Sequence, residues 1–223
     1  MSLRSLRSVA LQLFLAVALF VHGVVRAAAL DAPMVLVATP RLDATPYEQS
    51  VVLALPDDSG SHFGFVLNKL TNVSLAQVLP QERAMPRMDE HVYVGGPSLG
   101  DRLFALVDGH GAAKSDLIEV APDLFLAAQP PELKRVLADR ERDAHFYVGM
   151  VGWRRGELEA ELRAGSWIAL EPEVNLVMSA DPDQQWQRLV AVAHSVRVVG
   201  SYATMRTRPP TTDAGRLPIA AAA

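Results

Sequence analysis

The chain of 223 residues contains no cysteine. Disulfides, zinc thiolates and redox-active thiols are therefore excluded, and the chain could function in a reducing or an oxidising compartment. It also lacks the G-x-S-x-G nucleophile elbow, the G-x-x-x-x-G-K-[ST] phosphate loop, the H-E-x-x-H zinc motif and the G-x-G-x-x-G dinucleotide motif. We therefore predict no cofactor and no motif-based catalytic residue.

Histidine is sparse and scattered. The six histidines stand at positions 22, 62, 91, 110, 145 and 194. No two of them have the four-residue spacing that places both rings on one helix face, which is a common arrangement for metal ligands. We predict no metal site.

The N-terminal 29 residues have the layout of a secretory signal peptide. Arg4 and Arg7 precede an apolar run from Val9 to Val25, and small residues follow Arg26. We predict cleavage of this segment and a periplasmic or secreted protein, which would touch a membrane only if the segment stayed uncleaved. The alternative is translation from Met34, directly before the first strand pattern, which would give a cytoplasmic protein.

The remaining chain is acidic. Removal of residues 1–27 takes away three arginines and no acid, which leaves 18 basic residues against 25 acidic ones and a net charge of −7. Proteins that bind nucleic acids present basic patches to the phosphates, and no Lys/Arg cluster is present here. We do not expect a nucleic-acid partner.

The hydrophobic pattern predicts one domain over residues 30–199 and a disordered tail over residues 200–223, which is rich in Pro, Thr and Ala. Strands are predicted at 35–38, 51–55, 62–68, 91–94, 102–107, 117–120, 124–127, 145–149 and 166–170. Helices are predicted at 74–79, at 132–139, at 156–165 and after Asp181. Strands come in adjacent runs more often than in strict alternation with helices, so we predict an α+β fold with a mostly antiparallel sheet.

Two glycine-rich bends allow opposite interpretations. Gly95 and Gly96 follow a strand, and such a pair can expose backbone amides as an anion-binding nest or can simply make a sharp turn. Gly149, Gly152 and Trp153 precede a glutamate-rich helix. This second bend could offer bare amides and an indole to a ligand, or it could be a packing corner.

Three polar residues, Thr39, Ser50 and Asn68, stand at strand ends or entries. Such positions often make turns or caps. They would join a binding site only if the fold brings them beside the glycine bends.

Eight spaced segments together resemble the YqgE/AlgH family of bacterial proteins. They are VATP (37–40), YEQSVVL (47–53), GFVLN (64–68), VYVGGP (92–97), YVGMVGW (147–153), GELEAEL (156–162), GSW (165–167) and the late Trp186. The resemblance implies a bifurcated, mainly antiparallel sheet that curls into a pseudo-barrel with flanking helices. The biochemical role of the family is poorly defined, although one branch is labelled a transcriptional regulator of alginate production and members are ordinarily cytoplasmic.

Our first hypothesis is a non-enzymatic binding or regulatory module that takes an unknown small ligand or protein partner. Its expected surface comprises Thr39, Ser50, Asn68, Gly95, Gly96, Gly149, Gly152 and Trp153. One alternative is a cytoplasmic regulator that starts at Met34. Another is a weak hydrolase or transferase in which Ser98 or Ser50 attacks, glycine amides bind the oxyanion and one of His62, His91 and His145 acts as base.

Overall fold

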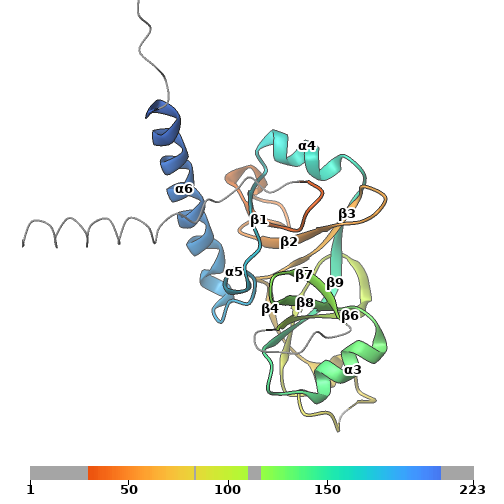
Figure 1. Cartoon of the computed structure of the whole chain (residues 1–223). Coiled ribbons are helices and arrows are strands. Elements are labelled where there is room, and N and C mark those ends of the chain that lie inside the picture. The colour runs from red at the N-terminus through yellow and green to blue at the C-terminus, as the bar shows by residue number, and fades with distance from the viewer. Residues whose placement is uncertain (1–29, 83, 110–116, 207–223) are drawn as a thin grey trace, which may run out of the picture.

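The computed structural model describes residues 30–82, 84–109 and 117–206 (Figure 1). The predicted signal peptide and residues 207–223 of the predicted tail lie outside the described residues. The strands are β1 (Met34–Ala38), β2 (Val51–Pro56), β3 (His62–Val66), β4 (Leu70–Ser74), β5 (His91–Val94), β6 (Ser98–Asp108), β7 (Ile118–Ala121), β8 (Leu124–Ala127), β9 (Ala144–Trp153) and β10 (Trp167–Leu170). The helices are η1 (Pro40–Leu42), α2 (Leu75–Val78), α3 (Pro130–Ala138), α4 (Glu157–Ala164), α5 (Val174–Val177) and α6 (Pro182–Arg206).

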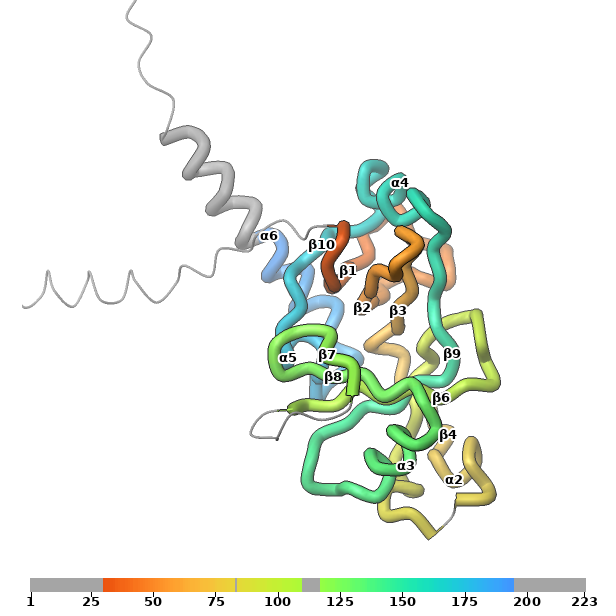
Figure 2. Tube along the Cα trace, turned by 45° about the vertical axis from the view of Figure 1, so that its right-hand side comes forward, coloured from red at the N-terminus to blue at the C-terminus, as the bar shows by residue number. Residues whose placement is uncertain are grey.

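The strands of the described residues form one sheet of ten strands that forks at β9. The main order is β10-β1-β2-β3-β9-β6-β8-β7, and the β4–β5 pair joins β9 beside β3. The end of β9 pairs with β3, with Trp153 opposite His62, while its middle pairs in parallel with β5, with Phe146 opposite Val92. All other strand pairs are antiparallel, so the predicted α+β class and the bifurcated, curled sheet are confirmed (Figure 2).

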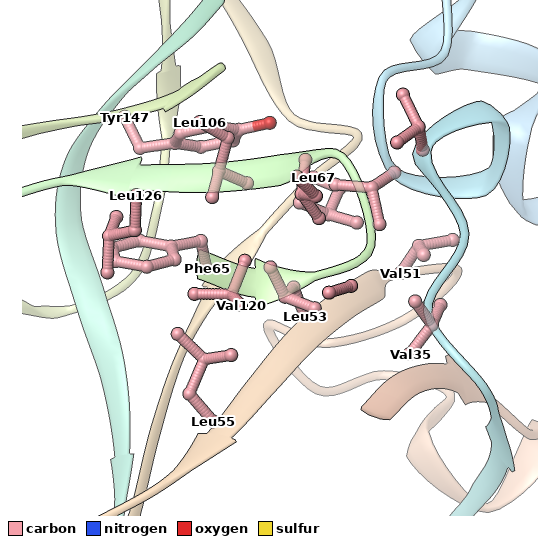
Figure 3. Close-up of a cluster of buried hydrophobic side chains, with 14 of the residues drawn as sticks. Val35, Val51, Leu53, Leu55, Phe65, Leu67, Leu106, Val120, Leu126 and Tyr147 are labelled. Carbon is pink, nitrogen blue, oxygen red and sulfur yellow. The ribbon is translucent and has the colours of Figure 1, made fainter. Parts of the chain in front are cut away.

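Strands β1 and β2 are apolar along their whole length because both of their faces are covered. Every residue of β1 is at most 1% exposed. One face of β1 and β2 contributes to the cluster inside the curl, where Leu53, Phe65 and Tyr147 pack (Figure 3). The other face, with Leu36, packs against side chains that include Leu158 of α4. Strands buried on both faces lose the alternating polar pattern, as seen here.

Local signals set the helix ends. Ser74 and Gln77 form the predicted capping box of α2, and Asp181 Oδ1 accepts from the backbone N–H of Gln184 at 3.2 Å at the start of α6. Gly165 ends α4 in a left-handed conformation, with φ of 75°. None of the described helices combines the length and the apolar character that a membrane span requires.

Several predicted boundaries were wrong. We predicted that the strand would stop at Gly149, but β9 continues to Trp153, because its last residues gain a new partner in β3. Helix α6 continues to Arg206, into the predicted disordered tail. The short elements η1, β4 and α5 carry too little periodicity to be recognised in the sequence, and all three were missed.

Candidate functional site

The two glycine bends meet and pack against each other. The N–H of Gly95 donates to the carbonyl of Val148 at 2.8 Å. A Cβ atom placed on Gly149, which has φ of 74°, would lie 2.4 Å from the carbonyl oxygen of Gly96. A Cβ atom on Gly96 would lie 2.2 Å from the carbonyl carbon of Met150. These glycines therefore let two backbones approach more closely than any side chain permits, which is a structural role.

The remainder of the second bend divides into an open residue and a buried one. Gly152 is exposed, and a Cβ atom there would meet nothing within 4 Å. Trp153 is only 5% exposed, and its indole N–H donates to Glu161 Oε2 at 3.0 Å. The indole N–H of Trp167 donates to the same oxygen at 2.7 Å. The glutamate of α4 thus ties the ends of β9 and β10 together, and the Trp153 N–H is already used within the fold.

The three polar residues at the strand ends have different surroundings. Thr39 Oγ1 donates to the carbonyl of Gly165 at 2.7 Å, so the hydroxyl links the end of β1 to the end of α4. Asn68 Oδ1 accepts from the N–H of Val51 at 2.9 Å, and its Nδ2 donates to the carbonyl of Gln49 at 2.8 Å. Ser50 lies between these two backbone groups and is fully buried, and its Oγ has no hydrogen-bond partner.

Thr39 and Asn68 line two neighbouring hollows that share Trp186 as a wall. We call the two hollows together the Trp186 groove. The larger hollow has a volume of about 600 Å³ and is lined by Ala38, Thr39, Pro40, Arg41, Gly165, Ile168, Trp186, Val190 and His194. The smaller one has a volume of about 310 Å³ and is lined by Gln49, Asn68, Lys69, Leu70, Thr71, Val94, Asp183 and Trp186.

The Trp186 ring is held rigidly at the centre of this groove. Its indole N–H donates to the carbonyl of Ala38 at 2.9 Å, at the end of β1. The side chain is only half-buried and packs at the edge of both core clusters that flank β1 and β2. An aromatic ring that is anchored by a hydrogen bond and lines both hollows is suited to binding, because an incoming apolar group loses little freedom by stacking on it.

The two hollows differ in charge. The larger one includes Arg41 and His194, and none of its described lining residues carries a carboxylate. The smaller one contains both Lys69 and Asp183. The Lys69 ammonium donates to the carbonyl of Glu48 at 3.2 Å. The groove therefore has one mainly apolar half with a cationic edge and one polar half.

A serine nucleophile finds no base in the described part of the chain. Ser50 Oγ is buried without a partner, and no hydrogen bond joins Ser50 or Ser98 to a histidine ring within the described residues. His62 Nε2 is 2.8 Å from the carbonyl of Leu30. Burial lowers the pKa of His145 below the usual histidine value, although Asp143 opposes the shift. The described residues also contain no group of three His, Asp or Glu side chains arranged to hold a metal ion.

The eight residues predicted for one surface therefore separate into four places. Gly95, Gly96 and Gly149 are together in a backbone contact, and Gly152 and Trp153 follow at the end of β9. Thr39 and Asn68 lie on opposite hollows of the Trp186 groove, and Ser50 is buried. Trp186 served in the sequence analysis as part of the family resemblance, and its half-exposed place between the two hollows was missed. A large aromatic residue one turn into a helix, after an Asp-Pro start, was the available signal.

Comparisons with known proteins all indicate the same family. A family model described as AlgH-like matches residues 35–195. A UPF0301 protein of Myxococcus xanthus is 30% identical over 158 residues, which cover 70% of this chain and 86% of that protein. A UPF0301 protein of Streptomyces avermitilis is 31% identical over 162 residues, which cover 70% and 82%.

Two solved structures share the fold. The solution structure of the AlgH protein from Pseudomonas aeruginosa aligns with a TM-score of 0.59 at 23% identity, over 82% of this chain and 96% of that chain. A crystal structure of a Corynebacterium diphtheriae protein aligns with a TM-score of 0.61 at 19% identity, over 83% and 91%. At these identities the likeness concerns the backbone architecture alone.

Proposed function

The chain belongs to the AlgH-like family, and from that premise we propose that it is a non-enzymatic binding module, with the Trp186 groove as its ligand site. One observation carries the proposal: Thr39 and Asn68, two polar residues expected at the site, line two hollows that share one half-buried, rigidly held indole. A concave site with an aromatic wall and a few polar groups is the usual form of a small-molecule site. The glycine bends support the nearby backbone and do not contact the ligand.

Within the described residues no hydrogen bond joins Ser50 or Ser98 to a histidine ring, which supports binding over covalent catalysis. Ser50 has neither access to solvent nor a partner, and covalent catalysis requires both an exposed nucleophile and an activating group. A regulatory role fits a binding module, because a ligand in the groove would contact β1, β10 and α6 at once and could bias their packing.

The binding proposal is tested by two-dimensional NMR with a metabolite panel and with fractionated periplasmic extract. We expect the indole N–H signal of Trp186 to shift together with the amide signals of Thr39 and Asn68. The indole signals of Trp153 and Trp167 provide an internal control, since Glu161 holds both in the interior. Shifts confined to other surfaces, or none with any sample, would reject the groove as the site.

We also propose that the protein acts outside the cytoplasm. The support is the order of basic, apolar and small residues in segment 1–29, which precedes the family domain matched from residue 35. N-terminal sequencing of the native protein from fractionated cells tests this proposal. A periplasmic chain that begins near residue 28 or 30 is expected, whereas a cytosolic chain beginning at Met34 would overturn export and favour the alternative of a cytoplasmic regulator.

A further inference from the structure

The larger hollow of the Trp186 groove has features that specify a class of ligand. We propose, on the basis of the binding function above, that this hollow takes a small amphipathic carboxylate. The hydrocarbon part lies against Trp186, Ile168 and Val190, and the carboxylate pairs with the guanidinium group of Arg41. The assignment depends on the charge of the hollow, on the placement of Arg41 and on the apolar walls.

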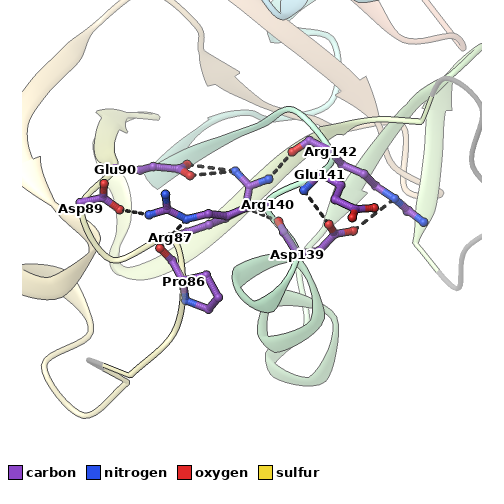
Figure 4. A network of polar contacts seen from close by, with 8 residues as sticks. All are labelled: Pro86, Arg87, Asp89, Glu90, Asp139, Arg140, Glu141 and Arg142. Atoms are coloured by element: carbon purple, nitrogen blue, oxygen red, sulfur yellow. Dashed lines mark hydrogen bonds and ion pairs between the residues drawn. The ribbon is translucent and has the colours of Figure 1, made fainter.

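Arg41 is an arginine without a partner in the described part of the chain. No described carboxylate lies within ion-pair distance of its guanidinium group, and only its backbone N–H is bonded, to Thr39 Oγ1 at 3.3 Å. Two other arginines are paired with carboxylates, as Figure 4 shows: Arg87 pairs with Glu90 at 2.9 Å, and Arg140 pairs with Asp89. Arg41 therefore retains its donors for an external anion.

The backbone that carries Arg41 is anchored within the fold. The residue belongs to the single turn η1, which Thr39 caps and the Thr39–Gly165 hydrogen bond ties to the end of α4. The side chain runs beside Gly165, where a Cβ atom would be 3.6 Å from Arg41 Nε. The arginine side chain therefore lies next to Gly165, at the edge of the hollow.

The remaining walls favour hydrocarbon. Ile168, Trp186 and Val190 are all partly buried, and all three pack against the main core cluster. They come from β10 and from successive turns of α6, so the wall is built on rigid elements. The volume of about 600 Å³ suits a small molecule, for which pockets of about 300–1,000 Å³ are usual.

The charge favours a carboxylate over a phosphate. A guanidinium group matches the two oxygens of one carboxylate through parallel hydrogen bonds. Phosphate sites generally add further cations or the amides of a helix start. Here Trp186, Val190 and His194, which run from the second turn of α6 to its middle, face the hollow, and the first turn of α6 carries Asp183.

The test compares octanoate, octanamide and acetate by isothermal titration calorimetry and NMR on the full chain. Octanamide has the same chain without the charge, and acetate has the charge without the chain. We expect octanoate to shift the Trp186 indole signal and to bind at least about 10-fold more tightly than either of the others. Raised salt should reduce this preference, because the ion pair is at the surface.

Variants separate the charge from the fold. Arg41→Gln should lower octanoate affinity to that of octanamide, and Arg41→Lys should restore part of the difference. Arg102→Gln is the matched control, since Arg102 is an exposed arginine on β6 outside both hollows. Unchanged thermal unfolding of all three variants verifies that the fold is retained.

The outcomes distinguish this inference from the binding function itself. Equal affinity for octanoate and octanamide, or an octanoate affinity that Arg41→Gln leaves intact, overturns the carboxylate assignment while groove binding stands. Equal affinity for acetate and octanoate overturns the proposal that the hydrocarbon chain of the ligand packs against the apolar walls. If octanoate does not shift the Trp186 signal but other members of the metabolite panel do, the carboxylate assignment is rejected and groove binding stands. If no molecule shifts that signal, both proposals are rejected.

Discussion

Trp153 and Trp167 donate their indole N–H groups to one carboxylate oxygen, Oε2 of Glu161, at 3.0 and 2.7 Å. The two rings come from β9 and β10, which are separated in the sheet by β1, β2 and β3. Tyr47 packs edge-on against Trp167, with ring centroids 5.9 Å apart. A single helical glutamate therefore links the end of β9 to the start of β10, which accounts for one of the three glutamates that follow the glycine–tryptophan bend.

Glu161→Ala should destabilise the protein substantially. The change leaves two buried indole N–H groups without an acceptor, and each unsatisfied buried donor costs about 1–3 kcal/mol. We expect the free energy of unfolding to fall by about 2–5 kcal/mol, measured by urea denaturation. Glu159→Ala on the exposed face of the same helix is the control and should change stability by less than about 0.5 kcal/mol. Equal effects of the two changes would contradict the bridging role.

The two glycines of the Gly-x-x-Gly-Trp segment should respond differently to alanine. Gly149 has φ of 74°, and a Cβ atom there would lie 2.4 Å from the carbonyl oxygen of Gly96, so Gly149→Ala should cost at least about 2 kcal/mol or prevent folding. Gly152 has open space around it and no positive φ, so Gly152→Ala should change stability by less than about 1 kcal/mol. Thermal unfolding of both variants measures the difference. A well-folded Gly149→Ala protein would show that the bends are not in close contact.

Asn68→Ala should lower the stability of the protein at the start of β2. Its amide group bonds both the N–H of Val51 and the carbonyl of Gln49, and a net loss of about 1 kcal/mol for each bond predicts a decrease of about 2 kcal/mol. Asn72→Ala, at an exposed position of β4, should be nearly neutral. Hydrogen exchange of the Val51 amide gives a local readout and should accelerate only in the Asn68 variant. An unchanged exchange rate of the Val51 amide in the Asn68 variant would show that the two Asn68 hydrogen bonds do not stabilise the start of β2.

The stability of the fold should decrease in mildly acidic solution because of His145. Its ring stacks on Tyr93, with centroids 5.1 Å apart, and burial lowers its folded-state pKa. Above the unfolded pKa of about 6.5 the ring is neutral in both states, so its contribution is fully retained. As the pH falls below that value, the unfolded chain takes up a proton that the folded chain resists, and the free energy of unfolding decreases until the folded pKa is passed.

Urea denaturation from neutral pH to about pH 5 measures this slope. His145→Phe keeps an aromatic ring beside Tyr93 and removes the titrating group, so its profile should be flatter between those limits. Parallel profiles for the two proteins would assign the acid sensitivity to other groups. Asp57, whose pKa is lowered mainly by hydrogen bonding to Ser59, loses its charge only at much lower pH and does not interfere.

The local part of the fold could be predicted from the sequence because its signals are local. The strand at residues 91–94, the capping box of Ser74 and Gln77, and the end of α4 at Gly165 all follow from neighbouring residues, and the structure has them in place. The end of β9 could not be predicted in this way. Whether residues 150–153 remain extended depends on the pairing of Trp153 with His62, which is about 90 residues away along the chain.

The candidate site was less accessible to sequence reasoning than the fold. Glycines at 95, 96 and 149 look alike whether they expose amides or pack backbone on backbone, and only the contact between the two bends decides for packing. Thr39 and Asn68 were chosen as polar residues at strand ends, but their relation to Trp186 depends on the docking of α6 against β1 through the Ala38 carbonyl.

The sequence by itself determined the α+β class, most strand and helix positions and the family, because hydrophobic periodicity, caps and spaced motifs are written in consecutive residues. The tertiary structure alone decided which polar groups are already used within the protein and which remain open to a ligand. The Trp153 N–H already donates to Glu161, whereas Trp186 and Arg41 line one hollow and no described carboxylate pairs with Arg41. The physical reason is that hydrogen-bond satisfaction and cavity shape depend on residues brought together from distant parts of the chain.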